Sequence, residues 1–262
     1  MTCVRPAPLH GWRRRVHTEH VWTTVVTIDV RGADLPAPDV AEVLRACAQF
    51  THDVDSWFSP FRDDSAVCAI RRGELTEADA PAPVPEVLAE CRRARDITSG
   101  VFDPWGSDTG GFDPSGYVKG WAAGRMAAMV TSAGFANVCV NAGGDVSCRG
   151  EQSPGHPWAV GIQHPARRDD VVRVVHARDN AVATSGRYER GEHIFDPTTG
   201  GSPRRMLDSA TVVGPDAGLA DALATALVIA GAYGVRFLRE IPEYSAYLIS
   251  GGRAQMFGPA FA

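Results

Sequence analysis

The sequence lacks the features that mark several common functional classes. Its 262 residues carry a formal net charge of −5, so there is no overall basic field of the kind that favours generic binding of nucleic acid. No run approaches the roughly 20 apolar residues of a membrane-spanning helix. The cluster of Arg13, Arg14 and Arg15 is not followed by the apolar stretch of about 7–15 residues that a secretory signal needs. We therefore expect no nucleic-acid partner, no membrane span and a cytoplasmic location.

Several familiar site motifs are also missing. The six cysteines contain no C-x-x-C pair, and the chain has neither a Walker A motif nor a G-x-S-x-G elbow. His17 and His20 form an H-x-x-H pair without further ligands at a zinc-like spacing, so we assign them to surface or strand roles. Cys47 and Cys91 fall on the apolar faces of predicted helices, which indicates buried free thiols.

Hydrophobic periodicity predicts a mixture of helices and strands. A possible capping box at Asp39 and Glu42 opens a helix that extends to about Asp53. The strands cluster in the second half without regular βα alternation, which favours an α+β fold with a mixed or antiparallel sheet over a doubly wound one. The other predicted helices are centred on 87–94, 121–132, 218–230 and 234–240, and the predicted strands on 21–30, 136–141, 158–163, 171–177, 210–214 and 245–250.

Three glycine-rich or polar segments are candidates for binding loops. Residues 100–120 are rich in Gly, Asp and Pro and predict an irregular, site-forming loop. The NAGGD segment at 141–145 could bring backbone close to a phosphate, although a hairpin turn explains it better by itself. Residues 183–188, with Thr184 and Ser185, predict either an anion-binding nest or a polar turn.

The ADALAT segment at 220–225 is the best local signal for a metal site. Asp221 and Thr225 are four residues apart on a predicted helix, so their side chains project from the same face. A carboxylate and a hydroxyl suit a hard cation such as Mg²⁺. The alternative is an acid favoured by the helix dipole, with a threonine bonded back to a carbonyl, and the residues alone leave both readings open.

The HIFDPTTG segment at 193–200 predicts a turn that carries a histidine. His193 could act as a general base, because histidine titrates near neutrality. A lone histidine is more often structural or exposed, so this segment does not establish a catalytic role by itself.

Seven segments, taken in order, resemble the ApbE family of FAD:protein FMN transferases. The resemblance extends from about Val21 to the C-terminal strand, and the order of the segments is far more specific than any one of them. It implies a single ApbE-like, T-fold-related domain over residues 21–262, preceded by a poorly ordered extension at 1–20. The segments are FSPFRDDS (58–65), GVFDP (100–104), KGWAAGR (119–125), NAGGD (141–145), ATSG (183–186), HIFDPTTG (193–200) and ADALAT (220–225).

The resemblance implies a reaction and a set of roles. FAD would be the substrate, Mg²⁺ the cofactor, and a flavoprotein with a Ser or Thr flavinylation segment the acceptor, with AMP released. Asp221, Thr225 and the backbone oxygen of Ala122 would hold the metal, and His193 would activate the acceptor hydroxyl. The implied FAD-binding positions are Val21, Val101, Phe102, Asp103, Gly116, Lys119, Arg125, Thr184 and Phe195.

The sequence departs from the family pattern at three places. Gly124 stands where an acid is usual, Val21-Trp22-Thr23 replaces Met-Gly-Thr, and Phe61 replaces a tyrosine. Two alternative functions are consistent with the same site residues. One is a Mg²⁺-dependent pyrophosphatase that splits FAD into FMN and AMP, and the other is a non-catalytic FAD-binding protein.

Overall fold

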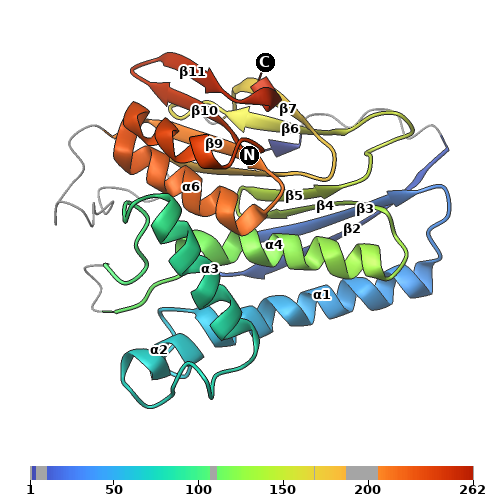
Figure 1. Ribbon diagram of the computed structural model, residues 1–262. Helices are drawn as coiled ribbons and strands as arrows, with labels where there is room; N and C mark the ends of the chain where they lie inside the picture. The colour runs from blue at the N-terminus through green and yellow to red at the C-terminus, as the bar shows by residue number, and fades with distance from the viewer. Residues whose placement is uncertain (1, 4–10, 107–110, 168, 187–205, 262) are drawn as a thin grey trace.

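The computed structural model describes residues 2–3, 11–106, 111–167, 169–186 and 206–261 (Figure 1). The helices in these ranges are α1 (Ala37–Phe58), α2 (Ala66–Arg71), α3 (Pro83–Ile97), α4 (Ser115–Ser132) and α6 (Ala217–Ala230), with 3-10 helices η1 (Gly231–Glu240) and η2 (Pro259–Phe261). The strands are β1 (Thr2–Cys3), β2 (Arg13–Val21), β3 (Thr24–Gly32), β4 (Asn137–Ala142), β5 (Asp145–Arg149), β6 (Trp158–Gln163), β7 (Val171–Ala177), β8 (Ala181–Gly186), β9 (Ser209–Gly214), β10 (Ser245–Ser250) and β11 (Arg253–Phe257).

The strands form two sheets. The larger has eight strands in the order β11-β10-β9-β8-β5-β4-β3-β2, and the smaller has three in the order β1-β6-β7. Every pairing in the two sheets is antiparallel. This arrangement confirms the predicted α+β class, because helices lie to one side of an antiparallel sheet rather than between parallel strands.

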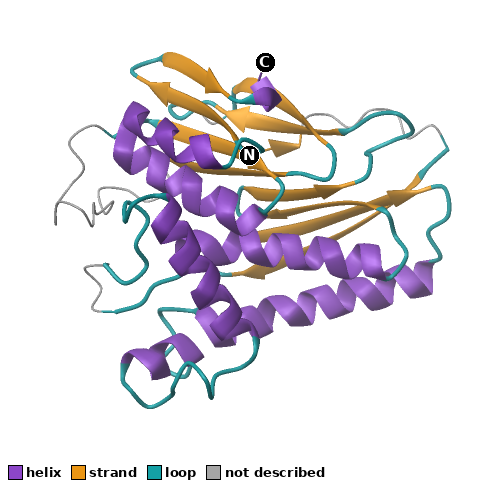
Figure 2. Ribbon diagram, in the orientation of Figure 1, coloured by secondary structure: helices purple, strands orange, loops and turns teal. Residues whose placement is uncertain are grey.

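The large sheet separates two apolar cores. On one face, Val26, Ile28 and Val30 of β3 pack with α1, α4 and α6 in the main core, and the helices cover this face in Figures 1 and 2. On the other face, Cys139 and Val146 pack against residues of β6 and β7 such as Trp158. Alternation along each strand therefore decides whether a side chain faces the helices or the small sheet.

The most apolar segment is the core helix of the fold. The stretch Ala217–Glu240, which comprises α6 and η1, is long and apolar enough by composition to cross a membrane, contrary to the expectation that no run would be. In the folded chain 72% of its apolar window is buried. A helix that is apolar all round and packed on all sides is expected at the centre of a globular core.

The folded domain begins earlier than residue 21. Arg13–Val21 is strand β2, which pairs with β3 from Arg13↔Gly32 to Val21↔Thr24. The predicted extension at 1–20 is therefore wrong for this part. The strand predicted at 21–30 instead contains the turn of a hairpin, at Trp22 and Thr23. The polar sequence of β2 conceals it, because β2 is the last strand of the sheet and its side chains are largely exposed.

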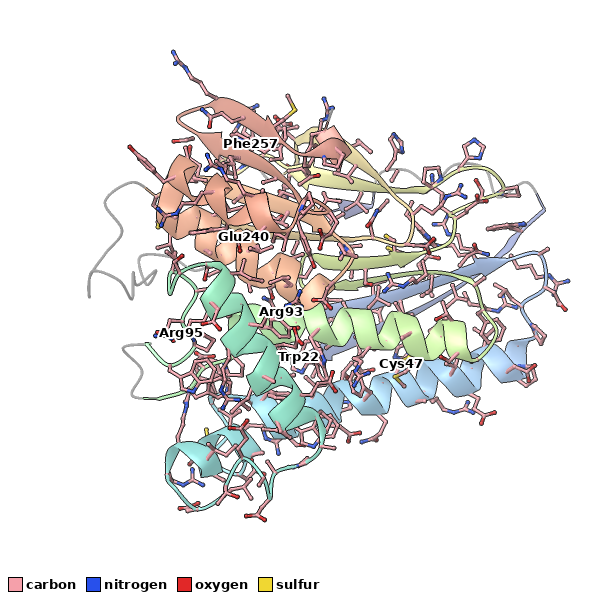
Figure 3. All side chains as sticks on the ribbon, viewed as in Figure 1. Trp22, Cys47, Arg93, Arg95, Glu240 and Phe257 are labelled. Carbon is pink, nitrogen blue, oxygen red and sulfur yellow. The ribbon has the colours of Figure 1, made fainter. Side chains whose placement is uncertain are left out.

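Several other local predictions are confirmed and some are corrected. Cys47 and Cys91 are buried free thiols, burial raises the pKa of Cys47 to about 11, and Figure 3 shows Cys47 on α1 beside α4. The capping box at Asp39 is wrong, because α1 begins after Pro36 without a side-chain cap. The predicted helix at 234–240 is the 3-10 helix η1. Strands β5 and β11 were missed.

Helices α4 and α6 cross at two glycines. A Cβ atom on Gly120 would meet the carbonyl oxygen of Ala217 and lie 2.7 Å from its carbonyl carbon, and one on Gly218 would lie 2.6 Å from the ring of Tyr117. The absence of side chains at Gly120 and Gly218 therefore allows the two helices to approach closely. This approach brings the first turns of α4 next to α6.

We expect Gly120→Ala to destabilise the fold by about 1–3 kcal/mol, since the obstacle is backbone that cannot rotate away. Gly124→Ala is the matched control on the same helix, because its Cβ would lie 3.8 Å from the Ala217 Cβ, an ordinary contact. The control should be neutral or stabilising by up to about 1 kcal/mol. Urea unfolding of both variants measures the difference, and equal stabilities would contradict the close crossing.

Candidate functional site

Two hairpin turns lie side by side at one end of the large sheet. Trp22 and Thr23 join β2 to β3, and Gly143 and Gly144 join the neighbouring strands β4 and β5. The Gly143 amide donates to the Val25 carbonyl at 3.2 Å. Gly143 has φ +64°, and a Cβ there would lie 2.8 Å from the Thr24 hydroxyl. The NAGGD segment is therefore a hairpin turn, as its residues alone favour, with Asp145 as the first residue of β5.

A cleft of about 680 Å³ opens beside the first of these turns. It lies between the β2–β3 turn, the C-terminal part of α1 with the loop that follows, and the start of α4. Phe61 is 90% exposed at its edge, whereas Trp22 is held by a 3.1 Å hydrogen bond from its indole Nε1 to the Thr51 carbonyl. The lining residues are Trp22, Thr23, Val54, Asp55, Phe58, Ser59, Pro60, Phe61, Asp113, Ser115, Val118 and Lys119.

Lys119 connects this cleft to two buried acids. Its Nζ lies 3.1 Å from Oδ2 of Asp145 and 3.4 Å from Oδ2 of Asp221. The two carboxylate side chains are 4% and 2% exposed, and the lysine side chain is 31% exposed. Three different elements, α4, β5 and α6, thus bring one positive and two negative groups together.

The ammonium group offsets the cost of burying the two carboxylates. An ionised acid in a dry environment loses much of its hydration free energy unless a counter-charge and hydrogen bonds replace it. Asp221 does not act as the cap of α6, because Asp216 takes that role by accepting from the Leu219 amide at 2.7 Å. The structure thus brings Asp221 to Lys119 rather than to the cap of α6.

Asp145 was not predicted as a site residue. Its only sequence signal is its place at the end of NAGGD. No local pattern indicates that it forms an ion pair with Lys119.

Thr225 and Thr184 lie on opposite faces of the large sheet. Thr225 Oγ1 is 3.0 Å from Ser185 Oγ, and this contact is on the helical side. Thr184 Oγ1 instead lies 2.8 Å from Thr211 Oγ1. The segment 183–186 belongs to the buried strand β8 rather than to a nest or polar turn. Ser185, and not Thr184, is therefore the residue of this segment that is brought to Thr225.

Ala122 lies one turn after Lys119 on α4. Residues three apart share a helix face, so the two are neighbours there. As a mid-helix residue, Ala122 uses one lone pair of its carbonyl for the helical hydrogen bond and retains another.

The other predicted FAD-binding positions are not gathered at the Lys119 cluster. Val101 and Phe102 are buried in the main core, and Asp103 pairs with Arg95 at 2.9 Å. Arg125 leaves α4 in another direction and pairs with Glu86 of α3 at 2.6 Å.

Val21 lines a second hollow, of about 550 Å³, that shares Trp22, Thr23 and Asp55 with the cleft. Gly116 is buried in the first turn of α4. Of the predicted site residues that the structure describes, Lys119 alone lines the cleft. His193 and Phe195 lie outside the described residues.

The oxygen ligands near Lys119 suit a hard cation that the protein binds through only a few side chains. Within the described ranges, no group of three or more His, Cys, Asp or Glu residues could enclose a metal. Asp221 and Thr225 offer a carboxylate and a hydroxyl from one helix face, and Asp145 lies across the lysine. Mg²⁺ commonly accepts such a small protein contribution, because water and phosphate oxygens complete its shell.

Comparison with known proteins identifies relatives of this chain. The model of the ApbE family matches residues 107–248, more than half of the chain. An FAD:protein FMN transferase of Salmonella typhimurium is 35% identical over 122 residues, which cover 43% of this chain and 35% of that protein. One of Rhodobacter capsulatus is 33% identical over 187 residues, which cover 68% of this chain and 34% of that protein. The chain therefore spans about a third of the length of these curated relatives.

Solved structures show the same fold. The flavin transferase ApbE from Vibrio cholerae superposes with a TM-score of 0.82 at 21% identity, covering 95% of this chain and 98% of that one. The ApbE protein from Thermotoga maritima superposes with a TM-score of 0.79 at 24% identity, with the same coverage. These likenesses confirm the predicted ApbE-like fold.

The turn beside the cleft stores backbone strain. Trp22 and Thr23 both have φ +56°, the left-handed region that two-residue hairpin turns require and that Asn-Gly fills best. We expect Thr23→Gly to stabilise the protein by about 1 kcal/mol, because glycine adopts this conformation without the strain of a side chain. Thr27→Gly, within β3, is the control and should destabilise. Thermal unfolding compares them, and a loss of stability in Thr23→Gly would contradict the strain.

Proposed function

The chain belongs to the ApbE family, and we propose that it transfers FMN from FAD to a Ser or Thr hydroxyl of an acceptor protein, with Mg²⁺ bound and AMP released. The observation that carries this proposal is the Lys119–Asp145–Asp221 cluster at the side of the cleft. A flat aromatic ring and a pyrophosphate need an aromatic-walled space next to a group of charges. The cleft and the cluster supply these two parts next to one another.

The proposed binding mode divides FAD between the two parts of the site. Trp22 and Phe61 would contact the flavin ring in the cleft. Lys119 would contact the pyrophosphate, and Asp221, Thr225 and the Ala122 carbonyl would hold Mg²⁺. Val101, Phe102 and Asp103 remain the proposed adenosine contacts, and since the first two side chains are buried, their backbone would make the contact.

The proposed chemistry is a phosphoryl-type displacement. The acceptor hydroxyl oxygen bonds to the phosphorus of the FMN half, the bond from that phosphorus to the bridging oxygen breaks, and AMP leaves with that oxygen. The hydroxyl proton passes to His193, which the family resemblance alone suggests as base. When bound, Mg²⁺ would neutralise phosphate charge, and the protein would supply positioning and the positive charge of Lys119.

A direct assay separates the proposal from its two alternatives. The protein is incubated with FAD, Mg²⁺ and a candidate acceptor that bears a Ser/Thr flavinylation segment. Flavin fluorescence that stays with the acceptor after denaturation supports transfer. Free FMN and AMP without labelling indicate a pyrophosphatase, and bound FAD without either product indicates a binding protein.

We expect Asp221→Ala to reduce Mg²⁺-dependent transfer by at least about 100-fold, because a bound metal contributes several kcal/mol of charge stabilisation in a transition state. Asp39→Ala, an exposed acid in the first turn of α1, is the matched control and should retain activity. Unchanged turnover in Asp221→Ala would contradict the assignment of Asp221 as a Mg²⁺ ligand.

We expect His193→Ala to slow transfer by about 10²–10⁴-fold, the usual contribution of a general base, with little change in FAD affinity. Single-turnover transfer and fluorescence titration with FAD measure the two effects separately. Equal losses in both would make His193 a binding residue.

A further inference from the structure

Lys119 is the only lysine in the sequence. The chain has 26 basic residues, and arginine occupies every other basic position. An ammonium group is a compact point charge with three donors, whereas guanidinium is a planar fork with five. The one lysine lies where a single compact cation contacts carboxylates on two different elements, at 3.1 and 3.4 Å. A single ammonium group therefore serves both carboxylates at this position.

The ammonium group and a divalent cation would use the same carboxylate. Asp221, which Lys119 approaches through Oδ2, is also the acid that the proposed function assigns to Mg²⁺. Asp145 lies on the other side of the lysine, on β5, and contacts it more closely. The two acids therefore differ in role, since one is shared with the metal site and the other can retain the lysine.

We infer that the Lys119 ammonium group supplies the positive charge of this site when no metal is bound. When Mg²⁺ binds to Asp221, the ammonium group moves away from that carboxylate, and its contact with Asp145 holds it at the edge of the cleft. This inference rests on the metal-dependent transferase proposed above. It adds Asp145 as a positioning residue, because Asp145 determines where the released ammonium stays. Lys119 already lines the cleft, so a small shift away from Asp221 directs its charge toward a ligand bound there.

The net charge of Lys119, Asp145 and Asp221 predicts the order in which Mg²⁺ and FAD bind. Without a metal, the three groups carry one excess negative charge, which repels a pyrophosphate. With a divalent cation bound, the same groups carry one excess positive charge, which attracts it. Mg²⁺ binding should therefore precede FAD binding, and Lys119 would then contribute to holding the phosphate.

Isothermal titration of the FAD-free protein with Mg²⁺ tests the competition. We expect Lys119→Met to bind Mg²⁺ at least about fivefold more tightly than the wild type, a typical size for coupling between two ligands, although its metal-free form melts at a lower temperature. Lys119→Arg keeps the charge and should stay near the wild-type Kd. Arg93→Met removes a charge from an exposed pair with Glu90 on α3 and should leave the Kd unchanged.

The opposite pattern would overturn the inference. Unchanged or weaker Mg²⁺ binding in Lys119→Met shows that the lysine does not compete. Equal tightening in Lys119→Met and Lys119→Arg shows an effect of packing rather than of charge.

A second measurement uses the wild-type protein and so does not depend on the folding of a variant. Because the chain has one lysine, an acetylating reagent modifies a single ε-amine, and peptide mass spectrometry gives its rate. We expect Mg²⁺ to accelerate acetylation of Lys119 as it leaves Asp221, with Na⁺ at equal ionic strength as the control. An unchanged rate in the presence of bound Mg²⁺ contradicts the inference alone. Absence of Mg²⁺ binding contradicts both the inference and the proposed metal site. If Mg²⁺ accelerates the acetylation of Lys119 but no FMN is transferred, only the proposed function is contradicted.

Discussion

One ammonium group between two buried carboxylates holds the candidate site together. Lys119 on α4 contacts Asp145 on β5 and Asp221 on α6, so the charges link the helical layer to the large sheet. Burial of each acid is costly at this depth, and removal of the shared cation would take a counter-charge away from both. The geometry of the site and the packing of the core therefore depend on the same contact.

The surrounding structure makes this contact possible through small residues. Gly120 and Gly218 allow α4 and α6 to cross closely, which brings Lys119 within reach of Asp221. Gly143 lets the β4–β5 turn lie against Thr24 at the start of β3, and Asp145 follows that turn directly. The strained Trp22–Thr23 turn then forms one wall of the cleft. Backbone proximity, rather than large interlocking side chains, positions the charged groups and the aromatic wall.

The sequence predicts the parts of this protein whose signal is local. The sequence predicts the helix α6 and the strand SAYLIS at 245–250, because their apolar residues identify them without a partner. Strand β2 was missed because an exposed edge strand is polar and shows little alternation. The segment that forms strand β8 predicts a nest or a polar turn instead, because its small polar residues become buried only through β9 and α6. The Lys119–Asp221 contact spans 102 residues, and no local pattern encodes such a pairing, although Asp221 and Thr225 were identified from their spacing.

We predict that a divalent cation binds at Asp221 and Thr225, next to Lys119 and the aromatic cleft. Anomalous diffraction from crystals grown with Mn²⁺, which accepts the same oxygen ligands as Mg²⁺, tests this directly. The predicted result is an anomalous peak within bonding distance of the Asp221 carboxylate and the Thr225 hydroxyl, with the Lys119 ammonium turned toward the cleft. A peak elsewhere, or Lys119 still in contact with Asp221 beside a fully occupied Mn²⁺ ion, would contradict it.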